Sequence, residues 1–409
     1  MSRYLKKDKK IKILFVLQSI GFGGSMTSLI NLLGFLKKNE DLSIDVLFMD
    51  RYGELIEQAE QVAHILPANR ILQSVSATRN KLVRLNRFDL LVERAILAIQ
   101  GKVLGKTTEK IAFEIAGKSF SNKYNCVIAY QESIATKFVS NIVAQKKIAW
   151  VHNDFENVLQ LYGGVDEMNR EYASFDKIIC VSKAGQKNFQ KGLNFNPNHI
   201  DYVYNTLNVQ QIRARASVPI EKIILDNEKL LKSLRCKEKF KFVSSGRLVQ
   251  QKRFDIAIQA AKLLKIAGVD FCWFIIGSGQ LYSELAEMII HEGLEEYVYL
   301  TGGLKNPFPI VNCCDIFVLT SDFEAHPMVA NEALILGKPV ISTDFESAKE
   351  VVVNGQNGFI CEKSPQYVAN ACRKIIEDKQ FYFHLKSVTS KFQYQNNDIV
   401  KKVIDIIGE

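Results

Sequence analysis

Two carboxylates flank the expected start of a short helix in the last third of the chain. Glu324 and Glu332 lie within Asp315–Thr343, which reads as a buried strand, a polar loop, a helix and a second strand. A helix start presents unpaired N–H groups and a positive dipole end, which suits a diphosphate. Ionised carboxylates only accept hydrogen bonds, so beside such an anion they suit the vicinal hydroxyls of a sugar. Acids that simply complement the helix dipole are the competing interpretation.

Proline and glycine set the limits of this helix. Pro327 is expected at its first position, where a missing N–H costs nothing, and Gly337 with Pro339 ends it. The apolar runs on either side, at 316–319 and 339–342, are expected to be strands. The acidic loop therefore follows the carboxyl end of a strand, where ligands bind in parallel α/β sheets.

Two cations follow the end of another expected strand. The run SSGRL at 244–248 closes a strand near 240–244, and Lys252 precedes the next helix. Positive charge at that place would stabilise a departing diphosphate, a task that otherwise falls to a divalent metal. The chain has no Asp-x-Asp at a strand end and no His/Asp/Glu cluster with metal-ligand spacing, so we expect no metal. A solvated basic turn competes with this interpretation, more strongly for Lys252 than for Arg247.

Three glycine loops and one histidine also stand at strand ends. The GFGGS run at 21–25 would let backbone amides approach a phosphate, although it lacks the full dinucleotide fingerprint and fits a tight turn equally. GSG at 277–279 and TGG at 301–303 follow two strands of the second half. His152, within WVHND at 150–154, could orient an acceptor or polarise a sugar hydroxyl. A purely structural histidine is the alternative.

Apolar strand-like runs alternate with helical patterns in both halves of the chain, which is typical of βαβ units and parallel sheets. A polar, charged segment at 207–239 separates the halves. We therefore predict an α/β protein with two Rossmann-like parallel-sheet domains facing a cleft. The expected parts are an N-terminal domain at 1–206, a C-terminal domain at 207–390, and a C-terminal helix at 391–409.

Composition excludes several classes of protein. With 409 residues, 47% hydrophobic and 24% charged, the chain is ordinary globular material for about two domains. Eight cysteines at unrelated spacings favour reduced, buried thiols over a disulfide scaffold or a zinc site. The apolar run at the N-terminus is short and interrupted by Lys12, so a first strand is expected instead of a signal peptide. No run approaches the length of about 18 apolar residues that a membrane-spanning helix needs.

The positive charge is concentrated in one stretch of the first half. Residues 70–123 hold 11 basic and 4 acidic side chains, and an amphipathic helical pattern runs through 76–120. This surface could attract an anionic membrane. A solvated helix packed on the sheet fits equally well, and nucleic acid fits less well because aromatic residues are not interleaved with the charges. The basic residues Lys81, Arg84, Arg87 and Arg94 alternate with Leu82, Val83, Leu85, Leu90, Leu91 and Ile96.

Taken in order, these motifs resemble one known family. GFGGS, WVHND, ICVSK, YNTLN, SSGRLVQQK, GSG and TGG are followed by an E-x7-E pattern inside EAHPMVANEALILGKPVIST. This order is similar to the large retaining glycosyltransferase family 4 (group 1), over essentially the whole chain. The most specific parts are the E-x7-E pattern and the upstream G-R-L-x-x-x-K. The resemblance implies a GT-B fold and points to bacterial enzymes of capsular, exopolysaccharide or O-antigen synthesis. It implies that 1–206 is the acceptor-binding domain, that 207–390 is the nucleotide-sugar-binding domain, and that the helix at 391–409 returns to the N-terminal domain.

The resemblance also implies roles for individual side chains. Glu332 would bind the ribose hydroxyls of the nucleotide, and Glu324 would hold hydroxyls of the donor sugar. Arg247 and Lys252 would bind the diphosphate. His152 would lie at the reacting sugar. The implied catalytic residues are thus His152, Glu324, Arg247 and Lys252.

Backbone groups complete the implied donor site. Amides at 328–330 would assist the diphosphate, and the glycines of the first loop would close over the phosphates. The chain departs from the family at Ala325-His326, where Gly-Phe is usual, so His326 either alters donor choice or is a neutral replacement. The implied donor-binding residues are Gly23, Gly24, Ser245, Gly246, Arg247, Lys252, Gly277, Gly303, Glu324, His326, Pro327, Met328, Val329, Ala330 and Glu332.

The implied reaction is transfer of a hexose or N-acetylhexosamine from a nucleotide-diphosphate sugar, with retention and without a metal or other cofactor. UDP is expected from family frequency alone. The implied acceptor is a polyprenyl-diphosphate-linked glycan, and the implied location is the inner face of the cytoplasmic membrane. A nucleotide-sugar epimerase of similar fold and a non-catalytic partner subunit are the alternatives. Intact Glu324, Glu332, Arg247 and Lys252 weigh against the partner subunit, and the missing fingerprint weighs against a dinucleotide oxidoreductase.

Overall fold

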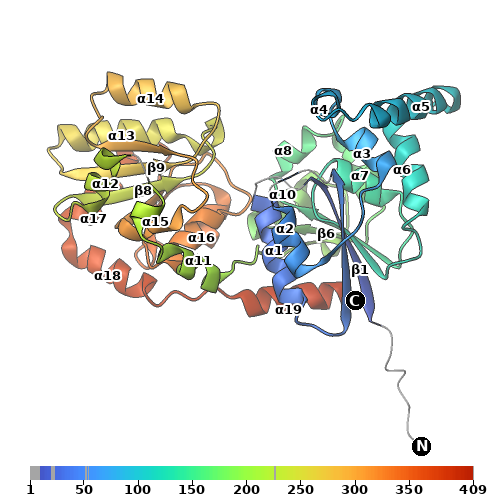
Figure 1. Cartoon of the computed structure of the whole chain (residues 1–409). Helices are drawn as coiled ribbons and strands as arrows, with labels where there is room; N and C mark the ends of the chain where they lie inside the picture. The colour runs from blue at the N-terminus through green and yellow to red at the C-terminus, as the bar shows by residue number, and fades with distance from the viewer. Residues whose placement is uncertain (1–9, 20–23, 51–52, 54, 225–226, 409) are drawn as a thin grey trace, which may run out of the picture. The chain divides into compact units, whose positions relative to one another are not determined.

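The computed structural model describes residues 10–19, 24–50, 53, 55–224 and 227–408. The chain divides into two compact units. Unit 1 comprises Met1–Thr206 with Asn396–Glu409, and unit 2 comprises Leu207–Gln395. In Figure 1 the colour runs from blue at the N-terminus to red at the C-terminus, so the chain can be followed through both units.

Unit 1 is built on a sheet of seven parallel strands in the order β3-β2-β1-β4-β5-β6-β7. The order reverses between β1 and β4, which is the switch point beside which open α/β sheets bind ligands. Helices cover both faces, so the central strands are apolar throughout and residues 13–17 of β1 are buried. The strands are β1 (Ile11–Ser19), β2 (Leu42–Asp50), β3 (His64–Ile65), β4 (Cys126–Ala129), β5 (Lys146–Val151), β6 (Lys177–Cys180) and β7 (Ile200–Tyr202).

The helices of unit 1 include one departure from the sequence prediction. The amphipathic stretch at 76–120 is divided into separate helices, because Asn86 and Gly105 adopt left-handed φ angles of 53° and 64° that end a helical turn. The helices are α1 (Gly24–Leu36), α2 (Ile56–Val62), α3 (Arg70–Ser76), α4 (Arg79–Arg84), α5 (Phe88–Leu104), α6 (Thr108–Lys118), α7 (Ile134–Ser140), α8 (Phe155–Leu159), α9 (Val165–Tyr172) and α10 (Lys183–Gly192), with the short 3-10 helix η1 (Pro197–His199).

The C-terminal helix α19 (Asn396–Gly408) belongs to unit 1. Lys402 Nζ lies 2.8 Å from Asp201 Oδ1, and Lys146 Nζ donates to the Ile406 carbonyl at 2.5 Å. Its apolar face packs inward while its charged face stays exposed. The predicted return of the last helix to the N-terminal domain is therefore confirmed.

Unit 2 repeats the plan with six parallel strands in the order β10-β9-β8-β11-β12-β13. All six residues of β9, FCWFII, are buried, as expected for a strand covered on both faces. The buried Trp273 Nε1 donates to Ser244 Oγ at 3.0 Å, and that hydroxyl donates to the Val318 carbonyl at 2.6 Å, so three strands share one polar chain. The strands are β8 (Phe240–Ser245), β9 (Phe271–Ile276), β10 (Val298–Gly302), β11 (Ile316–Leu319), β12 (Val340–Thr343) and β13 (Gly358–Cys361).

Two hydrophobic clusters lie on the two faces of this sheet and are closed by its helices. The predicted linker at 207–239 contains two helices of unit 2, α11 and α12. The helices are α11 (Val209–Ala216), α12 (Glu228–Arg235), α13 (Phe254–Ile266), α14 (Tyr282–His291), α15 (Phe308–Cys313), α16 (Met328–Ile335), α17 (Pro365–Glu377) and α18 (Lys379–Thr389), with the 3-10 helices η2 (Ile220–Lys222), η3 (Gln250–Lys252) and η4 (Glu346–Glu350).

The topology confirms the predicted fold class of two Rossmann-like parallel-sheet domains, because each strand order reverses once at a central switch point. All eight cysteines are free thiols, and most are buried in the two cores. Of the helices within the described ranges, none is both long and apolar enough to cross a membrane.

Candidate functional site

Unit 2 places its candidate residues on loops that leave adjacent strands. β8 and β11 are neighbours, and the strand order of the sheet reverses between them. Because the strands are parallel, the loops that follow them emerge at the same edge of the sheet. The loop after β8 carries Arg247 and Lys252, and the loop after β11 carries Glu324. Residues more than 70 positions apart in sequence are thereby brought together.

An ion pair joins the two loops. Lys252 Nζ contacts Glu324 Oε1, and Ser321 Oγ donates to the same carboxylate oxygen at 2.7 Å. The Lys252 and Glu324 side chains are only 12% and 11% exposed, so water screens the pair weakly. Glu324 Oε2 makes no hydrogen bond to any described residue, and this oxygen is left to accept from a ligand hydroxyl.

Three further hydrogen bonds hold the same loops together. Thr320 Oγ1 donates to the Lys252 carbonyl at 2.8 Å, and the Asp322 amide donates to the Gln251 carbonyl at 2.9 Å. Gln251 Nε2 donates to the Phe323 carbonyl at 2.8 Å. The backbone around the ion pair is therefore fixed without any ligand, which is the preorganisation that electrostatic catalysis requires.

Arg247 differs from Lys252 in having no hydrogen-bond or ion-pair partner among the described residues. Its side chain is exposed, and its guanidinium makes no hydrogen bond or ion pair within the part of the chain that the structure describes. Its neighbour Leu248 is fully buried and anchors the loop. Arg247 thus offers an unneutralised cation with several donors beside the switch point.

Close backbone packing explains the glycines of this edge. A Cβ atom on Gly277 would lie 1.9 Å from the Gly246 carbonyl oxygen, and no side chain fits there. The Gly246 amide in turn donates to the Ile276 carbonyl at 3.0 Å. Ser245 ends β8, and a Cβ atom on Gly303 would lie 3.0 Å from a serine hydroxyl of the preceding loop. These residues shape the loops, and their contact with a donor stays a prediction.

Helix α16 begins one residue later than predicted, at Met328, with Pro327 as the flanking residue. The Met328 amide donates to the His326 carbonyl at 2.9 Å, and the Ala330 amide donates to the Pro327 carbonyl at 3.1 Å. The Val329 amide has no acceptor among the described residues. Of the three amides expected to assist a diphosphate, one is therefore available without rearrangement.

His326 occupies the position at which the sequence departs from the family pattern. Its side chain is buried, with Nε2 lying 3.3 Å from Asn331 Nδ2 of α16. Burial lowers the pKa of His326 to about 4, so the imidazole is neutral at neutral pH. The ring packs against α16, and its influence on donor choice stays a prediction.

Glu332 lies in a cluster that sequence analysis missed. Burial raises the pKa of Glu332 to about 7, although the positive charge of Arg215 lowers it. Burial, and then the charge of Glu332, raise the pKa of Tyr394. Arg215 comes from α11, and its guanidinium stacks over the Phe308 ring at 5.0 Å. The residues of this cluster are at positions 215, 308, 332 and 394, and no local sequence pattern connects positions so far apart.

This raised pKa predicts a pH-dependent gain of stability in the Glu332→Gln variant. A carboxyl whose folded pKa exceeds its unfolded value stabilises the fold below the unfolded pKa, and that stability is lost as the pH rises through the folded value. Ionisation of Glu332 therefore weakens the wild type between about pH 5 and about pH 8. Glu332→Gln should gain about 2 kcal/mol in unfolding free energy relative to the wild type over this range.

Urea unfolding of the wild type and of Glu332→Gln, at about pH 5 and at about pH 8, measures the difference in unfolding free energy between them. Glu287→Gln, which replaces an exposed acid on α14, is the matched control and should show no such trend. An equal stability difference between Glu332→Gln and wild type at both pH values would contradict the raised pKa.

In unit 1, His152 follows β5 and is positioned by an acid that sequence analysis also missed. Glu132 Oε1 accepts hydrogen bonds from the His152 amide at 2.8 Å and from Asn153 Nδ2 at 3.0 Å. Glu132 is buried, and burial raises its pKa. The His152 ring lies 4.7 Å from the ring of Tyr130. The detectable signal for Glu132 was its place just after β4, at the switch point of its sheet.

The same switch point holds a buried polar network. Tyr130 Oη and Ser28 Oγ are 2.9 Å apart, and Ser28 Oγ donates to Asn205 Oδ1 at 2.7 Å. Ser133 has a φ angle of 72°, a left-handed conformation that costs a non-glycine residue about 1–3 kcal/mol. The loop after β4 is thus held in a shape that its own residues do not favour.

The predicted site residues fall in both units. Gly24 is the first residue of α1 and, like His152, belongs to unit 1, whereas Gly23 lies outside the described residues. The other predicted residues all belong to unit 2. Within unit 2 the structure brings Lys252 and Glu324 into direct contact.

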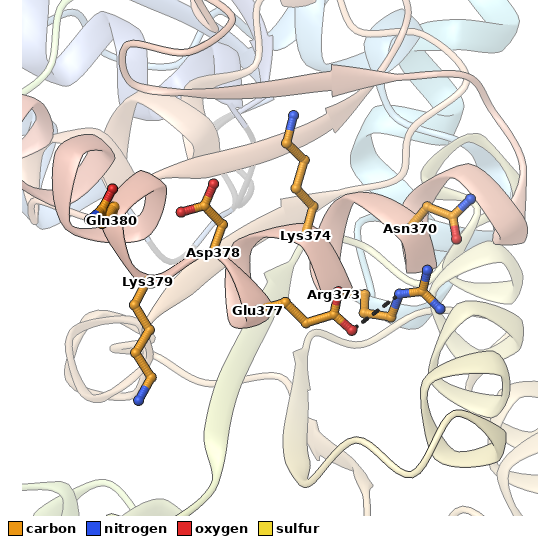
Figure 2. Close-up of a pocket in the computed structure, with 7 residues that line it drawn as sticks. All are labelled: Asn370, Arg373, Lys374, Glu377, Asp378, Lys379 and Gln380. Atoms are coloured by element: carbon orange, nitrogen blue, oxygen red, sulfur yellow. Dashed lines mark ion pairs between the residues drawn. The ribbon is translucent and has the colours of Figure 1, made fainter.

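A surface pocket of about 570 Å³ lies on α17 and α18 and is unrelated to these loops. Figure 2 shows that charged and amide side chains line it, including the Arg373–Glu377 pair at 3.5 Å. Tyr382 of α18 donates to Asp315, just before β11, at 3.1 Å, which places this region at the amino ends of the strands. Among the described residues, no group of three His, Cys, Asp or Glu side chains could hold a metal ion.

Comparison with known proteins gives a family match for part of the chain. Residues 226–391 match the family described as Glycosyl transferases group 1, and this segment carries all the unit 2 candidates except Arg215 and Tyr394. A Campylobacter jejuni protein, named N-acetylgalactosamine-N,N'-diacetylbacillosaminyl-diphospho-undecaprenol 4-alpha-N-acetylgalactosaminyltransferase, is 26% identical over 58% of this chain and 60% of its own length. The Staphylococcus aureus capsular polysaccharide biosynthesis glycosyltransferase CapM is 28% identical over 47% of this chain and 53% of its own length. The chain thus spans between half and three fifths of these relatives.

Solved structures match nearly the whole chain. Anabaena Alr3699/HepE in complex with UDP-glucose has a TM-score of 0.69 at 20% identity and covers 97% of this chain and 99% of its own. TarM has a TM-score of 0.71 at 13% identity and covers 99% of this chain and 100% of its own. The two-domain architecture is therefore that of GT-B glycosyltransferase structures.

Proposed function

We propose that this chain transfers a hexose or N-acetylhexosamine from a nucleotide-diphosphate sugar to a lipid-linked glycan in cell-surface polysaccharide biosynthesis. One observation carries the proposal: the Lys252–Glu324 pair holds a cation and a hydroxyl acceptor side by side at a switch point. A nucleotide-diphosphate sugar needs both groups within one site, since its phosphates are anionic and its sugar presents hydroxyls. The pair lies inside the segment that matches group 1 glycosyl transferases.

In the proposed donor complex, Arg247 and Lys252 bind the diphosphate. Arg247 is free to do so at once, whereas Lys252 has to share its ammonium between Glu324 and the phosphates. Glu324 Oε2 accepts from a hydroxyl of the donor sugar, and Glu332 accepts from the ribose. Ionised Glu332 is the better acceptor, and its pKa of about 7 makes that form substantial only near neutral pH and above.

In the proposed reaction the bond from the anomeric carbon to the diphosphate breaks as a bond to the acceptor hydroxyl oxygen forms, with retention. Negative charge grows on the departing diphosphate, and the two cations stabilise it without a metal. The proton of the acceptor hydroxyl passes to an oxygen of the departing diphosphate. His152, with its backbone fixed by Glu132, is proposed to lie at the reacting sugar.

Names of similar proteins support the substrates. The Campylobacter relative is named for a diphospho-undecaprenol substrate and CapM for capsular polysaccharide, while the HepE structures hold UDP, glucose and UDP-glucose. We accordingly propose UDP as the nucleotide and a polyprenyl-diphosphate-linked glycan as the acceptor. Because such an acceptor is embedded in lipid, the proposed location is the inner face of the cytoplasmic membrane.

Incubation with a panel of nucleotide sugars and a polyprenyl-diphosphate-linked glycan tests the function, with a chelator present throughout. The expected result is release of the nucleoside diphosphate and a lipid glycan heavier by one sugar residue. Proton NMR of the product should show the same anomeric configuration as in the donor. An altered sugar that stays on the nucleotide would instead identify an epimerase, and no turnover of any donor would favour a non-catalytic partner.

A further inference from the structure

Helix α5 carries an exposed apolar face that the fold of unit 1 does not use. Its residues follow one another at spacings of four, four, three and four, so they lie along one side of the helix. We call these residues the α5 outer face. They are Phe88, Val92, Ile96, Ile99 and Val103, with exposed fractions of 58%, 61%, 47%, 66% and 79%.

The opposite side of the helix anchors it to unit 1. Leu90, Leu97 and Gly101 are buried, and α5 packs on α3 and α6. A Cβ atom on Gly101 would lie 2.6 Å from the Lys106 carbonyl oxygen, which shows how closely the following turn approaches. Figure 1 shows α4 and α5 at one edge of unit 1. The helix is thus held by its inner side, and its outer side is free to bind something else.

The charges around α5 are arranged differently from the sequence expectation. Lys81 Nζ lies 2.5 Å from Asp50 Oδ2, and Arg94 donates to the Ala77 carbonyl at 3.0 Å. Arg87 pairs with Asp89 at 2.9 Å. Of the four cations predicted from the sequence to form a cationic surface, all but Arg84 are therefore bonded to groups within unit 1.

Three cations of α4 and α5 remain exposed. Arg79 and Arg84, at the two ends of α4, and Lys102, in the last turn of α5, make no ion pair with any described residue. Of the two acids of α5, Asp89 is exposed and is neutralised by Arg87 and by Arg70 at 3.5 Å, and Glu93 is half-buried. The surroundings are thus apolar at the centre and positive at the ends, which complements a lipid surface with anionic headgroups.

We propose that the α5 outer face inserts into the boundary between headgroups and acyl chains of an anionic bilayer, with Arg84 and Lys102 at the headgroups. A second copy of the chain fits this face less well, because a symmetric contact would bring the same uncompensated cations together. Burial of apolar side chains supplies most of the binding, so high salt weakens it only modestly. The inference rests on the membrane location in the proposed function and names the face that makes the contact, whereas its test measures binding to lipid, which needs no catalytic turnover.

Sedimentation of the full chain with vesicles of phosphatidylcholine and phosphatidylglycerol tests the insertion. Val92→Glu/Ile99→Glu places two charges on the apolar face and should weaken vesicle binding about 100-fold. Ile266→Glu, which changes an equally exposed isoleucine on α13 of unit 2, is the matched control and should bind as the wild type does. Circular dichroism should show that all the proteins remain folded.

A second variant separates insertion from electrostatic adsorption. Arg84→Ala/Lys102→Ala should lose the preference for phosphatidylglycerol while it still binds vesicles of phosphatidylcholine alone. Loss of all binding in this variant, or full release of the wild type by high salt, would overturn insertion. Unchanged vesicle binding by Val92→Glu/Ile99→Glu would overturn insertion as well. Insertion would also be overturned if light scattering showed that the wild type is a dimer and that Val92→Glu/Ile99→Glu is a monomer.

Release of nucleoside diphosphate with a soluble acceptor should be unaffected by either variant, which keeps this test separate from the proposed activity.

Discussion

Replacing Arg247 with alanine is expected to lower kcat by about 100- to 1,000-fold while the protein remains as stable as the wild type. Arg247 is exposed, and its side chain makes no hydrogen bond or ion pair with the described residues, so its removal leaves no buried group unpaired. Its proposed partner, the diphosphate, gains charge as the sugar departs. The loss should therefore fall on kcat more than on KM.

Steady-state kinetics with the best donor, together with thermal unfolding, measures both halves of this prediction. Arg235→Ala is the matched control, because Arg235 is an exposed arginine of unit 2 paired with Glu221 at the surface. This control should retain full activity. An Arg247→Ala variant with near-normal kcat would remove Arg247 from the reaction.

Replacing Lys252 with alanine is expected to affect both stability and turnover. Glu324 is only 11% exposed, and without Lys252 its charge would be left nearly buried with a single hydroxyl donor, Ser321. Loss of one partner of such a pair costs about 3 kcal/mol in unfolding free energy. Turnover should fall by about 100-fold or more, because one of the two cations at the diphosphate is gone.

A second change separates the two effects. Glu324→Gln removes the stranded charge, so the Lys252→Ala/Glu324→Gln double variant should recover most of the lost unfolding free energy. Its activity should stay at or below that of the Lys252→Ala variant, since both groups are proposed to contact the donor. If turnover returned together with stability, the ion pair would be a structural link between loops and the assignment of both residues to the donor site would fail.

The fold was largely predictable because parallel α/β structure leaves a strong local signal. The runs at 126–129 and 316–319 are apolar throughout, and the structure has strands β4 and β11 at the same residues. The two-residue strand β3 and the three-residue strand β7 leave no such signal, since so few residues carry no periodicity. The first turn of α16 differs by one residue because a proline before a helix fits either the first helical or the flanking position.

The donor loops were predictable as loops, but their contacts were not. Position after a strand pointed to Arg247, Lys252 and Glu324, whereas only the strand order reveals that the loops of β8 and β11 adjoin. The Lys252–Glu324 pair depends on that order. Glu132 and Arg215 escaped notice because each acts on a residue far away in sequence.

The basic stretch shows a different limit of sequence analysis. Counting charges at 70–123 indicated a cationic surface, yet Lys81 and Arg94 are used inside unit 1. Which side of an amphipathic helix faces the core follows from its packing partners and not from its own period. Only the packing of α5 on α3 and α6 identifies the outer face as apolar.

Calorimetric titration of UDP in the presence of a chelator tests the central claim most directly, because that claim is a nucleotide-diphosphate site on the loops after β8 and β11. The wild type and the Arg235→Ala control are predicted to bind UDP with equal affinity. The Arg247→Ala variant is predicted to bind UDP at least about tenfold more weakly, since it loses a charge-assisted contact to phosphate. Absence of UDP binding to the wild type, or equal binding by the Arg247→Ala variant, would contradict the account.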